Sequence, residues 1–454
     1  MNKSIILLII GLLFTIMGSA QSCLPNGIYF TTQAQIDSFP INYPNCTVIE
    51  GDVTIGTYGG SSNITNINGL NALKSINGDL KIWYNESLQD LSGLENLISV
   101  TSDFYITNNQ ALHTLVGLSS LLSIGGTFII NNIPRITNLS GLEHLYYIGS
   151  YLQIEQNTSL KSLTGTENLN DVGGLSIHDN DSIIVISGLE SLVTIGTCLI
   201  VDYNNSLKEI SGLNRLSAIG GYLWIKLNPG LTSVTGLTEL KSTGDFLGFQ
   251  ENPLLSKLSG LNKLTTVGGN LFVTDTDSLT SLNSLKNITS INGFLSLYNN
   301  KALTGLSGLE NIDPSKFKSL YLVNNNNLSV CAVKSICDYL ASPNGTAVIH
   351  NNAVGCNSQA EVDTTCKHLS VGDLTIVSAL SIYPNPVSDF LTIEISAFTT
   401  PGSLSITSLN GQELIKRQIT EPKTQIDIAN LPCGIYFVRL TGDKMVQMQK
   451  FVKQ

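Results

Sequence analysis

Apolar residues recur with a fixed period through most of the chain. The pair Gly-Leu returns every 24 residues, and once after 23, across the middle of the sequence. Its glycines are Gly69, Gly93, Gly117, Gly141, Gly188, Gly212, Gly236, Gly260 and Gly308, and the two remaining slots hold Gly165-Thr166 and Ser284-Leu285. A period of this length is typical of a repeat architecture in which each unit packs only on its neighbours.

One repeat unit predicts short extended segments. In residues 220–243 the apolar positions, separated by Gly, Asn and Pro, are Leu223, Ile225, Leu231, Val234, Leu237 and Leu240. This pattern favours three short strands and leaves no room for a helix of ten residues. A single unit buries too few side chains to offset the entropy of ordering it, so units must stack and the stack needs caps. We predict an all-β solenoid of about eleven 24-residue coils.

A column of asparagines supports the same architecture. In most units an asparagine lies three residues before the apolar residue equivalent to Leu231. The column contains Asn85, Asn109, Asn157, Asn180, Asn204, Asn228, Asn252 and Asn300, with Ile133 and Thr276 as the exceptions. Stacked amides bond to one another and to turn backbones, and Asn tolerates left-handed dihedral angles. We therefore predict a structural role for this column.

Residues 1–20 have the pattern of a secretory signal. Lys3 precedes an apolar stretch, and Gly18-Ser19-Ala20 provides small residues for cleavage. Lipidation of Cys23 is the alternative, but Ala20-Gln21-Ser22 is a poor match to the triplet that precedes a lipidated Cys.

Export to an oxidising compartment favours disulfides. Six cysteines fall at the two ends of the repeats: Cys23 and Cys46 before them, and Cys331, Cys337, Cys356 and Cys366 after them. The last four allow three pairings. Cys198 and Cys433 remain as single thiols.

Charge and motifs exclude several functions. The chain has a net charge of −10, and residues 21–379 contain 16 basic and 28 acidic residues, which argues against a nucleic-acid partner. No apolar run after residue 20 approaches the length of a membrane span, so we expect none in the mature chain. No metal-ligand, nucleophile or phosphate-loop motif occurs, and the paired aspartates at 179 and 181 and at 275 and 277 supply too few oxygens for calcium. We expect no cofactor and no metal.

Alternation along the strands identifies the outward residues. If Leu223 and Ile225 point inward, positions 222, 224 and 226 and their equivalents point outward. The outward aromatic residues are Trp83, Tyr105, Tyr151, Tyr222, Trp224, Phe246, Phe272, Phe294 and Tyr298. From them we predict a binding surface for a glycan or a protein, formed by Trp83, Tyr105, Tyr222, Trp224, Phe246, Phe272 and Tyr298. The alternative is that β-propensity alone places these rings, and that neighbouring coils shield them.

One outward column carries alternating charges. Glu155, His178, Asp202 and Lys226 occupy the same offset in successive units. At about 4.8 Å per coil, Glu155 and Asp202 lie roughly 9–10 Å apart, near the range for inverting glycoside hydrolysis. Polysaccharide cleavage by these two residues is therefore an alternative function. A solvated charge ladder accounts for the same pattern, and we expect a protein that is not an enzyme.

The repeats also resemble a known family. The segment 46–55, the pattern L-x-I…N-x-x-L-x-x-L-x-G-L…L-x-x-I-G-G and the closing segment with Gly355-Cys356-Asn357 and Cys366 resemble receptor L-domain-like repeats of secreted Bacteroidetes-type proteins, over about residues 23–370. The resemblance implies a right-handed parallel β-helix related to leucine-rich repeats. It implies a binding surface more often than an enzyme. A structural surface-layer component is a third hypothesis.

The 24-residue pattern ends near residue 380. Short alternating strands with Asn-Gly and Pro-containing turns then predict a small antiparallel β-sandwich. Its motifs, which in order resemble the type A sorting domain of the type IX secretion system, are Tyr383-Pro384-Asn385-Pro386, Gly411, Gly434-Ile-Tyr-Phe437 and Lys450-Phe-Val-Lys453. The resemblance implies that the secretion machinery is a partner and that the tail is typically removed after export.

These observations predict six segments. They are a signal peptide at 1–20, an N-terminal cap at 21–50, the solenoid at 51–327, a Cys-rich cap at 328–370, a linker at 371–379 and the sorting domain at 380–454. The mature protein is expected to be secreted or attached to the cell surface.

Overall fold

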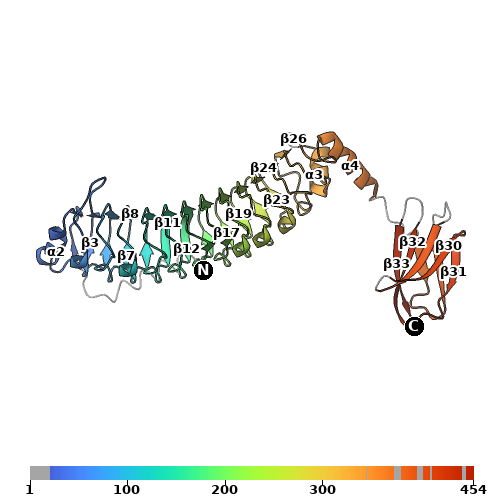
Figure 1. Ribbon diagram of the computed structural model, residues 1–454, viewed down its shortest axis with the longest axis horizontal. Helices are drawn as coiled ribbons and strands as arrows, with labels where there is room; N and C mark the ends of the chain where they lie inside the picture. Colours follow the sequence, from blue (N-terminus) through green and yellow to red (C-terminus); the bar gives the residue numbers. More distant parts are fainter. Residues whose placement is uncertain (1–20, 344, 373–379, 396–401, 410–411, 442–445) are drawn as a thin grey trace. The chain divides into compact units, whose positions relative to one another are not determined.

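The computed structural model describes residues 21–343, 345–372, 380–395, 402–409, 412–441 and 446–454 (Figure 1). The chain divides after Lys367 into two units, the solenoid with its caps and a smaller C-terminal unit. The predicted signal peptide and most of the predicted linker lie outside the described residues.

Parallel strands from successive coils form one sheet of 24 strands, as the repeat predicts. The longer strands form its main face: β4 (Val53–Ile55), β6 (Leu80–Trp83), β8 (Phe104–Thr107), β10 (Phe128–Asn131), β15 (Leu199–Asp202), β18 (Leu223–Lys226), β20 (Leu247–Gln250), β22 (Leu271–Thr274), β24 (Phe294–Tyr298), β25 (Ser319–Val323) and β26 (Ala347–His350). Residues 24 apart are paired across most of these strands, so equivalent side chains lie directly above one another.

A second strand of two residues precedes the longer one in most coils. These strands are β3 (Val48–Ile49), β5 (Ser75–Ile76), β7 (Ser99–Val100), β9 (Ser123–Ile124), β14 (Thr194–Ile195), β17 (Ala218–Ile219), β19 (Ser242–Thr243), β21 (Thr266–Val267) and β23 (Ser290–Ile291). The two strands are continuous in β11 (Tyr147–Glu155) and β12 (Asp171–His178), with a register shift between Ile148 and Tyr151.

The third side of the coil differs from the predicted strand. Only β13 (Val185–Ile186) and β16 (Glu209–Ile210) form a two-stranded sheet there. Elsewhere the described chain makes turns, five of them 3-10 helical: η1 (Asn68–Leu70), η2 (Val116–Leu118), η3 (Thr235–Leu237), η4 (Ser259–Leu261) and η5 (Asn283–Leu285). The reason is local, because backbone bonds from residue i+3 to residue i close these turns, as from the Leu118 N–H to the Leu115 carbonyl at 2.8 Å.

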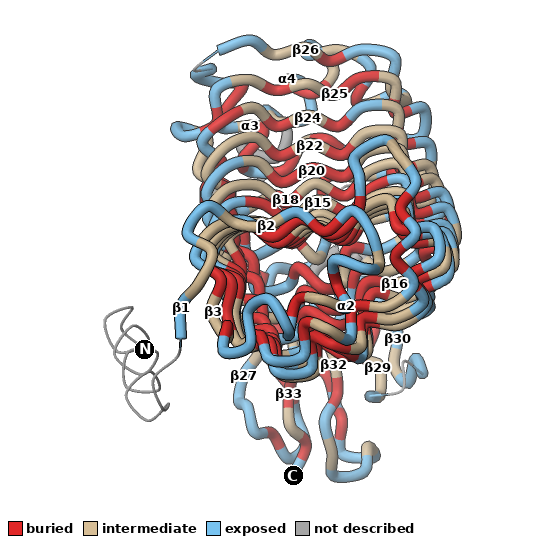
Figure 2. The backbone as a smooth tube through the Cα atoms, turned by 90° about the vertical axis from the view of Figure 1, so that its left-hand side faces the viewer, coloured by how far each residue is buried: buried red, intermediate tan, exposed pale blue. Residues whose placement is uncertain are grey.

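The interior is the predicted apolar stack. Leu223 and Ile225 are fully buried, and the equivalent positions of the coils from β4 to β25 are buried as well (Figure 2). Thr166, which replaces the usual leucine, is also buried, and its hydroxyl donates to the Leu163 and Gly188 carbonyls at 2.9 and 2.8 Å. A polar side chain is tolerated in this position because its hydrogen bonds are satisfied within the stack.

The recurring glycine is required by close contact between coils. A Cβ on Gly141 would lie 2.0 Å from the Leu115 carbonyl oxygen of the preceding coil. Five of these glycines, Gly93, Gly141, Gly165, Gly188 and Gly308, have a positive φ near +100°, and each donates its N–H to a glutamate two residues later. Gly69, Gly117, Gly236 and Gly260 lie in the 3-10 turns instead and lack that glutamate. In nine of the ten positions the residue two places after the glycine therefore marks the turn type, and Gly212, followed by Asn214, belongs to neither group.

The asparagine column forms the predicted ladder. Asn204 is fully buried, accepts the Asn180 N–H at 3.0 Å and donates to the Ile177 and Asp202 carbonyls at 2.9 and 3.0 Å. The ladder also includes Asn325, one coil further than the predicted column. The left-handed dihedral angle, however, belongs to the residue before each asparagine, such as Tyr203 at φ +57°. The asparagine recurs through the column because its side chain bonds backbone groups of neighbouring coils, and not because of its own φ.

Both ends of the solenoid carry helices that the all-β prediction did not include. At the N-terminus, β1 (Ser22–Cys23), β2 (Ile28–Phe30) and α2 (Gln33–Asn42) cover the first coil. At the C-terminal end α3 (Lys334–Ala341) comes before the last paired strand, β26, and α4 (Gln359–Gly372) follows it. Helices suit these positions because their own backbone bonds are internal and leave no open strand edge.

Disulfides join the cap segments. Cys23 pairs with Cys46, the two cysteines that precede the repeats. Of the three pairings open for the C-terminal four, the structure has Cys331–Cys356 and Cys337–Cys366, while Cys198 and Cys433 are free.

The C-terminal unit is the predicted antiparallel sandwich. One sheet holds β27 (Leu380–Tyr383), β28 (Phe390–Ile395) and β31 (Lys423–Asp427), and the other holds β29 (Gly402–Ser408), β30 (Glu413–Ile419), β32 (Gly434–Thr441) and β33 (Val446–Lys453). Leu391, Ile406, Val438 and Phe451 are fully buried between the sheets. Asn385 joins the Tyr-Pro-Asn-Pro motif to β33, because its amide donates to the Lys450 carbonyl at 3.1 Å and its oxygen accepts the Val452 N–H at 2.9 Å. The predicted motif residue Gly411 lies outside the described residues.

Replacing Asn204 by Ala should destabilise the solenoid strongly. The change leaves the buried Asn180 N–H without a partner and removes a hydrogen bond from the Ile177 and Asp202 carbonyls, although Asp202 keeps its bond from the Asp179 N–H. We therefore expect the free energy of unfolding to fall by about 3 kcal/mol. Urea denaturation followed by circular dichroism measures the loss. Asn204→Thr, which copies Thr276, should cost less, and Asn205→Ala, at an exposed position, should change stability by less than about 0.5 kcal/mol. Equal denaturation midpoints for all three variants would contradict this role.

Candidate functional site

Three outward columns of side chains cross the main face of the sheet. The strand register places Trp224 of β18 beside Ile200 and Gly248 of the neighbouring coils, and we call this line the middle column. The line two residues earlier, which contains Tyr222, is the leading column. The line two residues later, which contains Lys226, is the trailing column. The outward direction predicted for these positions is confirmed, since Leu223 and Ile225 between them are buried.

A continuous row of aromatic rings follows the leading and middle columns. Tyr222 stacks on Phe246 with ring centroids 4.4 Å apart, and Phe246 contacts Phe272 at 5.5 Å. Phe272 then contacts Phe294 at 6.4 Å, and Phe294 contacts Tyr321 at 6.0 Å. We call Tyr222, Phe246, Phe272, Phe294 and Tyr321 the aromatic ladder. Its rings are partly shielded by one another, and each keeps part of its surface in solvent.

Small residues make room for the ladder. A Cβ on Gly248 of the middle column would lie 2.2 Å from the Phe272 ring of the next coil. On the other side of Phe272 the same column holds Ser296. The Phe272 ring therefore lies over Gly248 of the adjacent coil, where a larger side chain would collide with it.

Trp224 borders the ladder but is covered. Its ring contacts Phe246 edge to face at 5.8 Å, and Lys226 Nζ lies 3.8 Å from the indole centroid. The indole N–H is shielded from solvent and donates no hydrogen bond to the described residues. Trp224 consequently acts as a wall beside the ladder and offers little free ring surface.

The ladder is electrically neutral at its start. Burial raises the pKa of Tyr222 to about 12, and the neighbouring Cys198 thiol adds to this shift. Cys198 is itself buried and lies 3.8 Å from the Tyr151 hydroxyl. The predicted outward residue Tyr151 lies against Gly174 and reaches Cys198, which neighbours Tyr222.

The structure brings together four of the seven predicted binding residues, Tyr222, Trp224, Phe246 and Phe272, and separates the other three. Trp83 forms its own cluster near the N-terminal cap, with edge contacts to Tyr58 at 5.5 Å and, through Tyr58, to Tyr84 at 5.5 Å. Tyr298 lies in the trailing column, where its hydroxyl accepts a bond from the Asn324 amide at 3.0 Å.

Tyr105 belongs to a polar network. Its hydroxyl donates to Asp103 at 2.7 Å, and burial together with that carboxylate raises its pKa. Lys81 lies 2.7 Å from Asp79, and Ser102 and the Asp103 N–H also donate to this aspartate. Although burial opposes the shift, these hydrogen bonds and the Lys81 charge hold the pKa of Asp79 below its usual value. The N-terminal part of the face is therefore polar, whereas the C-terminal part is aromatic.

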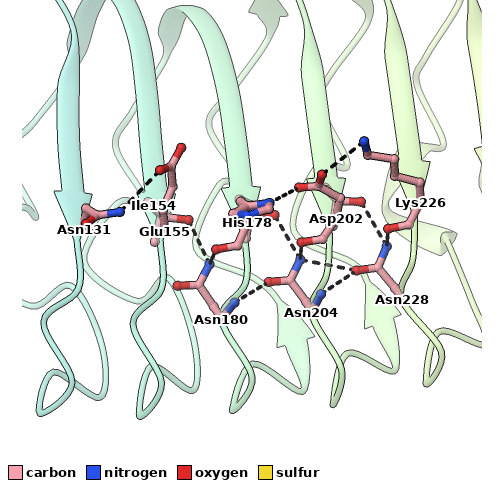
Figure 3. Close-up of polar contacts among 11 residues, drawn as sticks. Asn131, Ile154, Glu155, His178, Asn180, Asp202, Asn204, Lys226 and Asn228 are labelled. Atoms are coloured by element: carbon pink, nitrogen blue, oxygen red, sulfur yellow. Dashed lines mark hydrogen bonds and ion pairs between the residues drawn. The ribbon is translucent and has the colours of Figure 1, made fainter.

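The trailing column contains the predicted charge ladder. The register aligns Glu155, His178, Asp202 and Lys226 in successive coils (Figure 3). His178 Nδ1 lies 2.8 Å from Asp202 Oδ1, and Lys226 Nζ lies 3.6 Å from Asp202 Oδ2. The Asp202 side chain is only 8% exposed. Both oxygens of this carboxylate therefore face cationic or hydrogen-bonding partners of the chain itself.

Sequence reasoning missed two aromatic residues of this region. Tyr321 completes the ladder. The coil before it has 25 residues, since Leu297 pairs with Leu322, so a search at a fixed spacing of 24 residues misses Tyr321. The Asn300–Asn325 spacing carries the same signal. Tyr203 follows its strand in the left-handed position and contacts His178 edge to face at 5.3 Å.

The part of the chain that the structure describes contains no group of three or more His, Cys, Asp or Glu side chains placed to hold a metal ion. Among the helices in the described ranges, none has the length and apolar character needed to span a membrane.

Family comparisons agree with the two resemblances. Residues 45–133 and 250–367 match the Receptor L domain, and residues 381–454 match the Secretion system C-terminal sorting domain. The unmatched coils between 134 and 249 continue the same strand register. No curated protein matches the chain. The sorting domain makes this a secreted or cell-surface protein.

Asp79→Asn should reduce the acid sensitivity of the fold. Because the folded-state pKa of Asp79 is lowered, its stabilising effect is present above the unfolded value of about 3.9 and is lost as the pH falls through the folded value. Thermal unfolding measured from pH 7 to pH 3 should show a constant difference between wild type and variant above about pH 5, and a shrinking one below about pH 4. Glu86→Gln, at an exposed turn, is the control. A difference that grows towards low pH would contradict this assignment.

Proposed function

We propose that this chain, a receptor L-domain solenoid with a sorting tail, binds a glycan or a protein through its aromatic ladder and catalyses no reaction on it. The supporting observation is the unbroken contact of five rings across coils from Tyr222 to Tyr321 on the outward face. Contiguous apolar surface on the outside of a secreted protein is typical of an interaction site.

The packing of the ladder favours binding. A ring packed as Phe272 is, against Gly248 of the adjacent coil and against Phe246 and Phe294, loses little conformational freedom when a ligand covers it. Aromatic side chains on a rigid support suit both the apolar face of a sugar ring and the centre of a protein interface. Part of each ring's surface is already covered by the rings of neighbouring coils. A ligand would therefore contact only the ring surface that remains exposed to solvent.

The charge column supports a non-catalytic role. A general base or nucleophile needs an oxygen that can reach the substrate. Asp202 instead has His178 on one oxygen and Lys226 near the other, and its side chain is almost fully buried. Cleavage by Glu155 and Asp202 would require this arrangement to open. A panel of plant and algal polysaccharides tests the point, and new reducing or unsaturated ends would contradict our proposal.

Export would place this surface outside the cell. The sorting tail engages the type IX secretion machinery, and we infer that residues 1–20 are removed as a signal peptide and that the tail is removed after transport. Mass spectrometry of the secreted protein tests both cleavages. The mature chain would then present the solenoid alone, either free or attached to the surface.

Changing two rings of the ladder should abolish ligand binding while the fold remains. Phe246→Asn copies Asn270 of the leading column, and Phe272→Ser copies Ser296 of the middle column, so both residues are already tolerated there. A glycan and protein array identifies the ligand with the wild type, and we expect the double variant to bind it at least about tenfold more weakly.

Ile129→Ser is the matched control, because Ile129 occupies the middle column outside the ladder. Circular dichroism should be unchanged in all variants. Unchanged affinity of the double variant would reject the ladder as the site. If the chain instead assembles into ordered arrays and binds nothing on the array, it is a structural surface-layer component.

A further inference from the structure

A groove runs beside the sheet, on the turns that follow the long strands. It has a volume of about 540 Å³. Tyr203 and Leu227 line it from the left-handed position of their coils, and Pro229 and Pro253 line it from the turns. Tyr203 is 44% exposed. This part of the groove therefore presents an accessible apolar wall.

The other part of the groove is acidic. Glu251, Asp275 and Asp277 line it. Glu251 accepts a bond from Gln250 at 3.0 Å, Asp275 accepts one from Asn299, and Asp277 Oδ2 pairs with Lys301 at 2.7 Å. The second oxygen of each carboxylate accepts no hydrogen bond from the described residues, and that of Asp277 is shielded from solvent. The lining thus offers hydrogen-bond acceptors and negative charge.

The dimensions of the groove suit an extended chain. The residues in the left-handed position, Tyr203, Leu227, Glu251 and Asp275, come from four successive coils. At about 4.8 Å per coil they span about 14 Å, which is the length of roughly four extended peptide residues. Of these four residues, the apolar ones, Tyr203 and Leu227, lie in the first two coils and the carboxylates in the last two.

We propose that this groove binds an extended peptide segment of a partner protein, with an apolar side chain against Tyr203 and Leu227 and a basic side chain against Glu251 and Asp275. Charge complementarity argues for this occupant, because residues 21–379 have a net charge of −12 and the charged residues that line the groove are all acidic. A second copy of this acidic solenoid is a poor partner for the same reason. The site lies apart from the aromatic ladder and goes beyond the function proposed for it.

Calorimetric titration of the full chain with two peptides tests the proposal. The first is acetyl-Phe-Ala-Ala-Arg-amide, and the second has Gln in place of Arg. We expect the arginine peptide to bind at low ionic strength, the glutamine peptide to bind about tenfold more weakly, and added salt to weaken the first more than the second. No binding of the arginine peptide would overturn the proposal.

Variants that copy residues already present in the chain locate the site. Glu251→Gln with Asp275→Asn removes the charges while keeping acceptors for Gln250 and Asn299, and should weaken the arginine peptide about tenfold. Tyr203→Asn with Leu227→Asn removes the apolar wall, and Asn108 and Asn132 hold the same left-handed position in other coils. This pair should weaken both peptides.

Control variants distinguish the groove from the rest of the solenoid surface. Glu86 occupies the same turn position as Asn205 but in a coil outside the groove. Glu86→Gln removes its carboxylate and should leave peptide binding unchanged. Phe246→Asn with Phe272→Ser should also leave it unchanged, so failure of the ladder and failure of the groove are distinguishable. Equal peptide affinity in wild type and the charge variant would reject the site. Cellopentaose serves as the glycan probe. If it binds the wild type, fails to bind the variant Tyr203→Asn with Leu227→Asn, and is not displaced by the arginine peptide, the groove binds a glycan and the proposal is overturned.

Discussion

The Asn ladder is the interaction on which the solenoid depends. Each coil turns sharply after its long strand and leaves backbone groups inside the stack. In most coils one asparagine amide bonds them: Asn204 donates to carbonyls of its own and the preceding coil and accepts the N–H of Asn180. Because an unpaired buried polar group is costly, the ladder fixes the register between coils. Side chains at a given offset therefore form straight columns on the outside.

Columns on the outside turn a repeated sequence into surfaces. Variation at one offset changes a column coil by coil without disturbing the interior. The leading and middle columns begin with Asp79, Asp103 and Lys81 and continue as rings from Tyr222 onward. The trailing column separates these rings from the groove beside Tyr203 and Asp275. Two surfaces of different chemistry thus lie side by side, one on the sheet and one on the turns that follow it.

Much of the fold was predictable because its signals are local and repeated. A period of 24 with inward Leu223 and Ile225 predicts the stacking and the outward positions of Trp224 and Phe246. The helical caps were not predictable in the same way, since α2, α3 and α4 each occur once and have no repeat to support them. The prediction of a third strand was wrong in most coils because apolar spacing alone does not distinguish a short strand from a 3-10 turn.

The candidate site was predictable only in part. The sequence by itself determined which side chains face outward, because strand alternation needs no knowledge of distant residues. Only the tertiary structure decided which of them meet: Tyr321 joins the ladder after a 25-residue coil, Tyr105 is held by Asp103, and Lys226 covers Trp224. Contacts between neighbouring coils depend on the size and charge of residues about 24 positions apart. Those pairings exist only once the register of the stack has placed the residues side by side.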